Sequence, residues 1–237
     1  MLRVFRFLFL SAIKILGRIF YRFDFEWVGT PPQRPFERIR LNILLNHTSL
    51  LEPVVLSLLP FSYLWKTAGE AAFPAADITM NRSVAGTLYA ALAPHPISIS
   101  RRRDHTWRKF LELASGGALI FMTPEGRMKR LNGLDKHGKL MTVRRGVAEV
   151  LREIDDGDML VMHSGGLHHV LAPGWKFPRL FKEIRFRFEL LPIVGYKRFL
   201  DANRSGFEER VIADLEERRD RHCFSPATRE AVELQAA

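Results

Sequence analysis

The sequence predicts an α/β fold with a mostly parallel, twisted sheet flanked by helices. Short apolar runs that are typical of buried strands alternate along the chain with stretches of helical periodicity. The chain has 237 residues, of which 47% are hydrophobic, and this is enough for one domain with a full core. Polar residues follow several of the strand-like runs, at the strand ends where open α/β sheets gather their ligand sites.

Residues 1–22 are predicted to form a basic amphipathic helix. Its cations fall within an arc of about 160°, and apolar residues fill the rest of the helix surface; they are Arg3, Arg6, Lys14, Arg18 and Arg22. The longest charge-free stretch, residues 7–13, is far below the roughly 18 to 20 apolar residues that cross a bilayer. Two interpretations remain open. The helix lies in a membrane interface, its apolar face in the acyl boundary and its cations at anionic headgroups, or it packs on the domain's own core with solvated cations.

The chain divides into this helix with its linker (residues 1–35), a compact domain (residues 36–224) and a polar tail (residues 225–237). Residues 23–29 alternate like an edge strand, and three prolines make residues 30–35 an extended linker. Residues 39–45 form the first strong strand, and residues 49–59 form a helix that ends at Pro60. Residues 61–66 are assigned as a strand. The small and apolar residues 69–92 are assigned as one or two helices, interrupted near Pro74.

The second half of the domain continues the alternation of strands and helices. Residues 97–100 form a short strand that leads into Arg101, and residues 105–113 form a helix that ends at Gly116 and Gly117. Residues 118–122 are a buried strand, residues 131–139 a loop and residues 142–154 an amphipathic helix. Residues 159–162 and 184–188 are strands, and residues 206–221 form a surface helix that closes the domain.

His47 and Glu52 lie where the strand at residues 39–45 is expected to turn into a helix. On one continuous helix they would point about 140° apart, so they meet only if His47 lies on the turn before the helix. There the carboxylate would hold one ring nitrogen, and the other nitrogen could take a proton from a hydroxyl. A structural alternative is also open. Ser49 and Glu52 also spell a capping box, in which Glu52 binds the backbone N–H of Ser49.

Four blocks in the chain resemble those of the glycerolipid acyltransferases, the family that includes 1-acylglycerol-3-phosphate acyltransferase. His47 to Glu52 resembles the family's His-x-x-x-x-Asp signature, with Glu in the place of Asp. Residues 97–101 resemble the apolar second block that ends in Arg, and residues 121–127, Phe-Met-Thr-Pro-Glu-Gly-Arg, resemble Phe-Pro-Glu-Gly-Thr-Arg. Residues 159–173 stand where the fourth, apolar block is expected. The resemblance covers roughly residues 25–193 in the right order.

The resemblance implies a role for each matching residue. His47 would be the general base and Glu52 its orienting carboxylate, without a covalent acyl-enzyme. Arg101, Glu125, Gly126 and Arg127 would shape the acceptor site and bind its phosphate. The third block departs from the family pattern, because the Thr between Gly and Arg is missing and Met-Thr-Pro replaces Phe-Pro. Lys129 or Arg130 could therefore take over the anion contact, and the acceptor headgroup could differ from glycerol phosphate.

The expected reaction moves a fatty acyl group from acyl-CoA or acyl-carrier protein to the hydroxyl of a lysophospholipid-type acceptor. The formal charge of +10 agrees with anionic partners, and a peripheral position on the cytoplasmic face of a membrane is expected. Nucleic acid is not expected as a partner, since stacking aromatics and a recognition helix are missing from the pattern. The single Cys223 excludes an internal disulfide and suits a reducing compartment.

No bound cofactor and no metal are expected. His163, His168 and His169 invite a metal assignment, but no carboxylate or thiol stands nearby at ligand spacing. A second hypothesis for the whole chain is a catalytically degenerate family member that binds anionic lipid without chemistry. The altered third block motivates it.

Overall fold

A seven-stranded sheet forms the centre of the molecule, in the order β1-β7-β6-β2-β5-β3-β4. The computed structural model describes residues 1–76, 94–99 and 105–223. Five of the neighbouring strand pairs are parallel, and only β6 and β7 run antiparallel. The predicted α/β class with a mostly parallel sheet is therefore confirmed. The strands are β1 (Arg22–Trp27), β2 (Ile39–Leu45), β3 (Ala71–Ala76), β4 (His95–Ile99), β5 (Leu119–Met122), β6 (Asp158–Ser164) and β7 (Glu183–Pro192).

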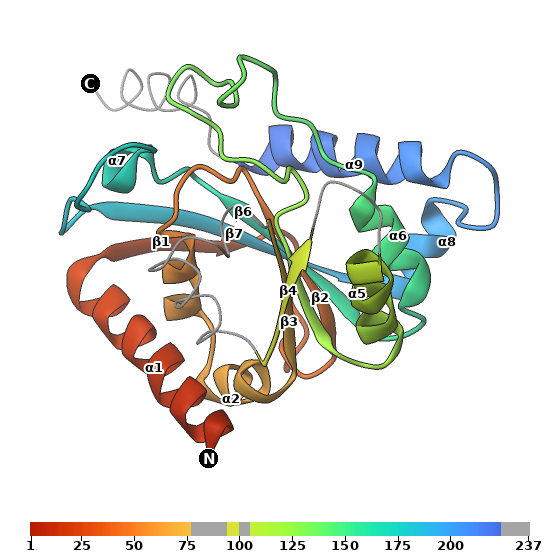
Figure 1. Ribbon diagram of the computed structural model, residues 1–237, viewed down its shortest axis with the longest axis horizontal. Helices are drawn as coiled ribbons and strands as arrows, with labels where there is room; N and C mark the ends of the chain where they lie inside the picture. The colour runs from red at the N-terminus through yellow and green to blue at the C-terminus, as the bar shows by residue number, and fades with distance from the viewer. Residues whose placement is uncertain (77–93, 100–104, 224–237) are drawn as a thin grey trace.

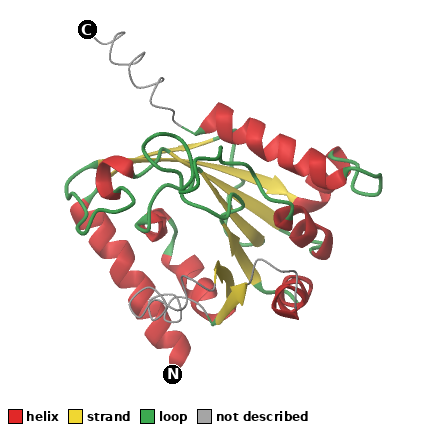
Figure 2. Cartoon of the chain, turned by 45° about the horizontal axis from the view of Figure 1, so that its top comes forward, coloured by secondary structure: helices red, strands yellow, loops and turns green. Residues whose placement is uncertain are grey.

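Helices cover both faces of this sheet and make a three-layer molecule (Figures 1 and 2). One layer contains α1 (Leu2–Phe20), the 3-10 helix η1 (Glu52–Leu58), α2 (Phe61–Glu70) and α7 (His168–Leu171); the other contains α5 (His105–Ser115), α6 (Gly146–Glu153), α8 (Ile193–Phe199) and α9 (Phe207–His222). The strands β2, β3, β5 and β6 supply both cores by alternation. In β2, Leu44 packs toward the α1 layer, whereas Ile43 and Leu45 pack toward the α9 layer.

The two central strands have the composition of strands that are buried on both faces. Every residue of β2 except Arg40 is buried, and so are Leu119, Ile120 and Phe121 of β5. Parallel strands covered by helices on both sides read as near-continuous apolar runs, which is why both strands were predicted from sequence. Because β2 and β5 are neighbours with the same direction, their carboxyl ends meet at one edge of the sheet.

The segment after Pro60 corrects two sequence predictions. Residues 61–66 are not a strand but the first part of α2, which buries Tyr63, Leu64, Thr67 and Ala68 on one helical face. Residues 71–76 are not helical but form β3. Ala71 and Ala72 are fully buried between β5 and β4, and the pairing with β5 ends before Pro74. Proline is tolerated at that point because one side of the strand no longer needs its N–H. Residues 77–92 of the predicted helices lie outside the described residues.

Three cations of the N-terminal helix α1, Arg3, Lys14 and Arg18, donate hydrogen bonds to backbone carbonyls of the domain. Lys14 donates to the carbonyls of Ser57 (2.9 Å) and Leu59 (2.8 Å), and Arg18 donates to the carbonyl of Ser57 (3.0 Å). These carbonyls end η1 and lack partners within that helix, so the cations satisfy them. Arg3 likewise donates to the carbonyl of Trp65. These three cations bind backbone carbonyls, whereas the sequence predicted that the cations of this helix lie at lipid headgroups or in solvent.

The outward side of α1 is apolar along its whole length. We call it the apolar face of α1, and it consists of Val4, Phe5, Leu8, Ala12, Ile15, Leu16 and Ile19, all of them exposed. No charged residue belongs to this face. Within the described ranges, no helix has the length and hydropathy that a bilayer crossing requires.

The other elements agree with the sequence predictions or add to them. The edge strand β1, the helices α5, α6 and α9, and the strands β4, β6 and β7 lie where the sequence predicted them, with shifted ends. The 3-10 helix η1 replaces a longer predicted α-helix. The short helices α7 and α8 were not predicted. Arg101 and the tail at residues 225–237 lie outside the described residues.

Candidate active site

His47 lies one residue beyond the turn that ends β2. Asn46 ends the strand with a φ of 63°, a left-handed conformation that Asn accepts more readily than most residues. The side-chain amide of Asn46 donates to the carbonyl of Ser164 (3.0 Å), which fixes this turn against the end of β6. His47 therefore precedes η1 instead of belonging to it, and this is the placement that lets it reach a carboxylate five residues later.

Glu52 serves His47 and the backbone at the same time. Its Oε2 is bonded to Nδ1 of His47, while its Oε1 accepts the N–H groups of Thr48 (2.5 Å) and Ser49 (3.2 Å). The capping interaction and the histidine contact, which the sequence presented as alternatives, are thus made by the two oxygens of one carboxylate. Glu52 is 4% exposed, so neither bond competes strongly with water.

The contact with Glu52 decides which nitrogen of His47 is reactive. Nδ1 carries the proton that the carboxylate accepts, and Nε2 is then the nitrogen with a free lone pair. Within the described part of the chain, Nε2 has no hydrogen-bond partner. Burial lowers the pKa of His47, but the charges of Glu52 and then Glu125 outweigh it, so the pKa lies above its ordinary value of 6.5. The ring is therefore a stronger base than a free imidazole.

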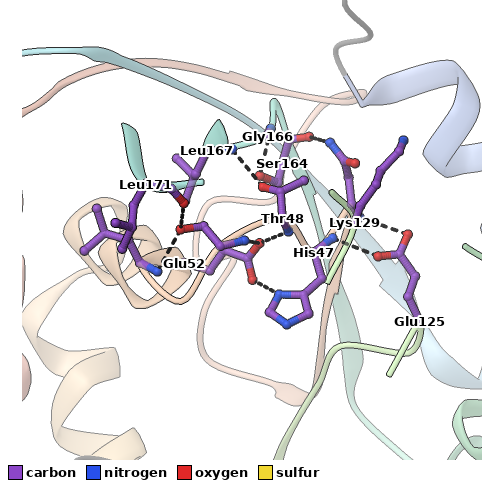
Figure 3. A network of polar contacts seen from close by, with 12 residues as sticks. His47, Thr48, Glu52, Glu125, Lys129, Ser164, Gly166, Leu167 and Leu171 are labelled. Atoms are coloured by element: carbon purple, nitrogen blue, oxygen red, sulfur yellow. Dashed lines mark hydrogen bonds and ion pairs between the residues drawn. The ribbon is translucent and has the colours of Figure 1, made fainter. Parts of the chain in front are cut away.

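Glu125 braces the His47 turn from the neighbouring strand. It follows β5 in the turn formed by residues 123–126, where Gly126 has a φ of +66° and its N–H binds the carbonyl of Thr123 (2.9 Å). The two Glu125 oxygens accept the consecutive backbone N–H groups of Asn46 (3.3 Å) and His47 (2.8 Å), as Figure 3 shows for His47. Consecutive N–H groups in a turn make a small anion-binding concavity, and here a carboxylate of the same chain fills it.

A further backbone bond joins the same two turns. The N–H of Lys129 donates to the carbonyl of His47 (2.8 Å), and the carbonyl of Lys129 accepts from Nε2 of His168 (2.6 Å). The third-block turn, the His47 turn and α7 therefore form one connected unit. Glu125 is 1% exposed, and its carboxylate bonds the backbone of Asn46 and His47, so its role here is to hold the His47 turn in place.

Sequence reasoning missed Arg219. This residue lies near the end of α9, and its Nη1 is 3.6 Å from Oε1 of Glu125. Burial raises the pKa of Glu125, while the His47 N–H and the Arg219 guanidinium oppose that rise; the net pKa lies above the ordinary value. Arg219 also donates to the carbonyl of Met141 (2.9 Å). No sequence signal distinguished it from the other charged residues of the surface helix.

The hydroxyl residues between His47 and Glu52 anchor the site to α7. The Thr48 hydroxyl accepts the N–H of Leu167 (2.8 Å), and the Ser49 hydroxyl donates to the carbonyl of Leu171 (2.7 Å). Both contacts appear around Glu52 in Figure 3. The segment after β6, which is the second part of the predicted fourth block, is therefore fixed directly beside His47.

Arg127, expected at the acceptor phosphate, is engaged within its own loop. Its guanidinium pairs with the carboxylate of Asp135, whose other oxygen accepts the N–H groups of His137 (2.7 Å) and Lys139 (3.0 Å). The amide of Lys139 and the guanidinium of Arg127 outweigh burial and lower the pKa of Asp135, so the pair is ionic at neutral pH. Arg101, the other predicted phosphate contact, lies outside the described residues.

The three histidines after β6 have separate partners. Nε2 of His163 lies 3.3 Å from Glu189, while His168 and His169 bind the carbonyls of Lys129 and Glu183. Among the residues that the structure describes, no three His, Cys, Asp or Glu side chains gather as metal ligands would. Burial raises the pKa of Cys223, which keeps this thiol protonated.

A comparison with known proteins adds one likeness of fold. The chain superposes on the crystal structure of the 1-acyl-sn-glycerophosphate acyltransferase PlsC from Thermotoga maritima with a TM-score of 0.58. The two sequences are 17% identical, and the alignment covers 90% of this chain and 77% of that one. No protein-family model and no curated protein matches the sequence. The likeness shows that the chain adopts the fold of that acyltransferase.

Proposed function

We propose that the protein is an acyltransferase that moves a fatty acyl group from acyl-CoA or acyl-carrier protein to the hydroxyl of a lysophospholipid-type acceptor. The observation that carries the proposal is the His47–Glu52 pair at the carboxyl end of β2, with Nε2 of the ring unbonded within the described residues. The fold of a 1-acyl-sn-glycerophosphate acyltransferase supports it. The order of the four sequence blocks supports it independently.

In the proposed reaction, Nε2 of His47 takes the proton of the acceptor hydroxyl as its oxygen attacks the thioester carbonyl. The carbon–sulfur bond breaks, and the thiolate leaves with the proton that His47 returns. Glu52 stabilises the imidazolium that exists between these two proton transfers and keeps the ring in one tautomer. No side chain forms a covalent bond with the acyl group.

The geometry supports an indirect role for Glu125 in this reaction. Its carboxylate is committed to the N–H groups of Asn46 and His47, so it orients the base instead of binding the acceptor headgroup. Rigid support of a catalytic group affects the rate, because a misplacement of about 1 Å can cost about 10²-fold. Binding of an anionic acceptor headgroup then depends on cationic side chains near Gly126.

The pairing of Arg127 with Asp135 bears on the choice of acceptor. A guanidinium that already binds a carboxylate offers little net charge to a second anion. We propose that the acceptor headgroup carries less charge than a phosphate monoester, or that Lys129 and Arg130 supply the missing cations. A panel of lysolipids with monoester and diester headgroups distinguishes the two.

The acceptor and the acyl products are lipids, and the apolar face of α1 supports a membrane surface as the place of reaction. Seven exposed apolar residues on one helix side match the interfacial position in which such a face enters the acyl boundary. The proposed location is peripheral, on the cytoplasmic side of the membrane where soluble acyl donors are available.

The test incubates the purified chain with a panel of lysolipids and labelled acyl-CoA or acyl-carrier protein, and new lipid is detected by mass spectrometry. The parent is expected to acylate at least one acceptor, and His47→Ala to lose at least about 10³-fold of that rate. His105→Ala, an exposed histidine on α5, is the matched control and keeps the parent rate. Equal turnover by His47→Ala and the parent would refute the assignment of the base.

The ion pair between Arg127 and Asp135 leaves Arg127 less able to bind an acceptor phosphate. It therefore also favours a second candidate function, a lipid-binding protein that performs no acyl transfer. Such a protein would bind anionic vesicles and give no new lipid with any donor in the panel. An Asp135→Asn variant separates the two further. It frees the guanidinium of Arg127, and a working transferase should then accept phosphate monoester acceptors better than the parent does.

A further inference from the structure

The loop between α7 and β7 exposes aromatic and apolar side chains to an unusual degree. We call residues 174–182 the aromatic loop. Phe177 is 81% exposed, Phe181 65%, Leu180 43% and Trp175 38%. The cations Lys176 and Arg179 stand between them, Lys182 follows Phe181, and all three cations are exposed as well. Large apolar side chains gathered on a surface mark an interaction site more often than isolated ones do.

This loop lies against the C-terminal end of α1. The N–H of Phe181 donates to the carbonyl of Phe20 at the end of that helix (2.7 Å), and the rings of Phe20 and Phe181 lie 5.9 Å apart, edge to face. In both Figures 1 and 2 the loop beside α7 adjoins the end of α1 that leads into β1. The aromatic loop is thus joined to the end of α1 next to Ile19, the last residue of its apolar face.

The loop has a defined backbone, and one residue holds a costly conformation. The N–H of Arg179 donates to the carbonyl of Val170 (2.8 Å), and that of Trp175 to the carbonyl of Ala172 (3.0 Å). Phe181 has a φ of 59°, which is unfavourable for a bulky residue. Asn or Gly would fit this backbone better. A strained phenylalanine whose ring is mostly exposed contributes little to the core, so its ring is explained by a partner.

We propose that the aromatic loop is a second membrane-binding element, which inserts into the headgroup region of an anionic phospholipid bilayer together with the apolar face of α1. Alternating aromatic and basic residues suit that region, where rings enter the acyl boundary and cations meet phosphates. The guanidinium of Arg179 lies 4.4 Å from the ring centroid of Trp175, so ring and charge are presented together.

A bilayer fits this surface better than a second copy of the chain. Lysine is depleted at the core of protein–protein interfaces, whereas two exposed lysines flank the aromatic rings here. The position also suits the chemistry. The loop follows α7, whose Leu171 carbonyl accepts from Ser49 beside His47, so a membrane-bound loop brings the His47 turn close to the lipid surface. In this respect the inference rests on the proposed function, in which the acceptor is a lipid.

Co-sedimentation with vesicles of phosphatidylcholine and phosphatidylglycerol tests the loop directly. The double variant Phe177→Ala, Phe181→Asn is expected to bind at least about tenfold more weakly than the parent, because it removes two inserted rings. Its melting temperature should equal or exceed that of the parent. Phe199→Ala is the matched control, since Phe199 is 73% exposed on α8, away from this surface, and it should bind as the parent does.

Two results would overturn the inference. One is parent-like vesicle binding by the double variant, and the other is an equal loss of binding by Phe199→Ala. Analytical ultracentrifugation tests whether a second copy of the chain occupies this surface. A dimer that the double variant dissolves, without any change in vesicle binding, would assign the surface to a second copy instead.

The vesicles contain neither acyl donor nor acceptor, so this test is independent of acyl transfer. His47→Ala should bind vesicles like the parent. If the loop is required for vesicle binding but no acceptor is acylated, the proposed reaction is wrong and the inference that the loop binds membranes is supported. If acylation occurs and the loop variants bind normally, the membrane inference alone fails.

Discussion

Two histidine–carboxylate pairs lie on neighbouring parallel strands of this protein and differ in what they can do. His47, just beyond the end of β2, bonds Glu52, and His163, within β6, bonds Glu189 of the adjacent strand β7. His163 stands in register with Leu45, two residues before His47. The side chain of His163 is fully buried, whereas that of His47 is 19% exposed. A shift of two residues along the sheet therefore separates a sealed pair from one at the surface.

The charges of the two carboxylates are also neutralised to different extents by their partners. Glu189 is bonded by Arg218 as well as by His163; burial raises its pKa, but these two partners lower it below the ordinary value. Glu52 accepts two neutral backbone N–H groups, so its charge acts mainly on His47. A histidine becomes a base when its carboxylate is not neutralised by a guanidinium and when its second nitrogen faces an opening.

The largest effect on this comparison should come from neutralising Glu52. Glu52→Gln removes the charge that stabilises the imidazolium, and its amide cannot serve His47 and the backbone as the carboxylate does. We expect acyl transfer to fall by about 10²-fold or more. Glu52→Asp, which keeps the charge on a shorter side chain, should stay within about tenfold of the parent. Steady-state rates of the two variants check this, and a Gln variant as active as the Asp variant would contradict it.

Removing the sealed histidine should affect stability instead of chemistry. His163→Ala leaves a cavity and breaks the bond to Glu189, which is expected to lower the free energy of unfolding by roughly 2 to 4 kcal/mol. Denaturant unfolding measures this. The rate per folded molecule should remain within about threefold of the parent. A large loss of rate with unchanged stability would mean that His163 takes part in the reaction.

A smaller effect is expected from Arg219, which reaches His47 only through Glu125. Arg219→Gln removes the cation 3.6 Å from the carboxylate, so the pKa of Glu125 rises further and the protonated form binds the two N–H groups less well. We expect a three- to tenfold lower rate, on the order of 1 kcal/mol, and a loss of activity that begins at higher pH than in the parent.

Two further variants distinguish this positioning role from a general effect on α9. Arg219→Lys keeps a charge near Glu125 and should restore part of the rate. Arg221→Gln, on the same helix, removes an exposed ion pair with Glu217 and should behave as the parent does. Identical behaviour of Arg219→Gln and Arg221→Gln would remove the role assigned to Arg219.

Local patterns carried most of the fold prediction. The strands β2 and β5 were found because their apolar runs are continuous, and α5 because two glycines follow it. The errors fell on residues 61–66 and 71–76, where aromatic residues filled a helix and alanines filled a strand. In both places tertiary packing overrode intrinsic propensity.

The site was predictable only in its local part. His47 and Glu52 are five residues apart, and a strand-to-helix turn suffices to bring them together. The bracing of His47 by Glu125 required knowledge that β2 and β5 are neighbours, and the contact of Arg219 required the placement of α9. Neither is encoded in a short pattern. The pairing of Arg127 with Asp135 depends on a loop whose course no periodicity predicts.

The pH dependence of acyl transfer, followed together with the NMR titration of the His47 ring, tests the central claim most directly. Because Glu52 and Glu125 outweigh burial, the ring should titrate above pH 6.5, and kcat/KM should rise with pH through that same value as the base form appears. In Glu52→Gln burial is no longer outweighed, so both midpoints should move below pH 6.5. A rate that ignores the titration of His47, or a midpoint that Glu52→Gln leaves unchanged, would contradict the account.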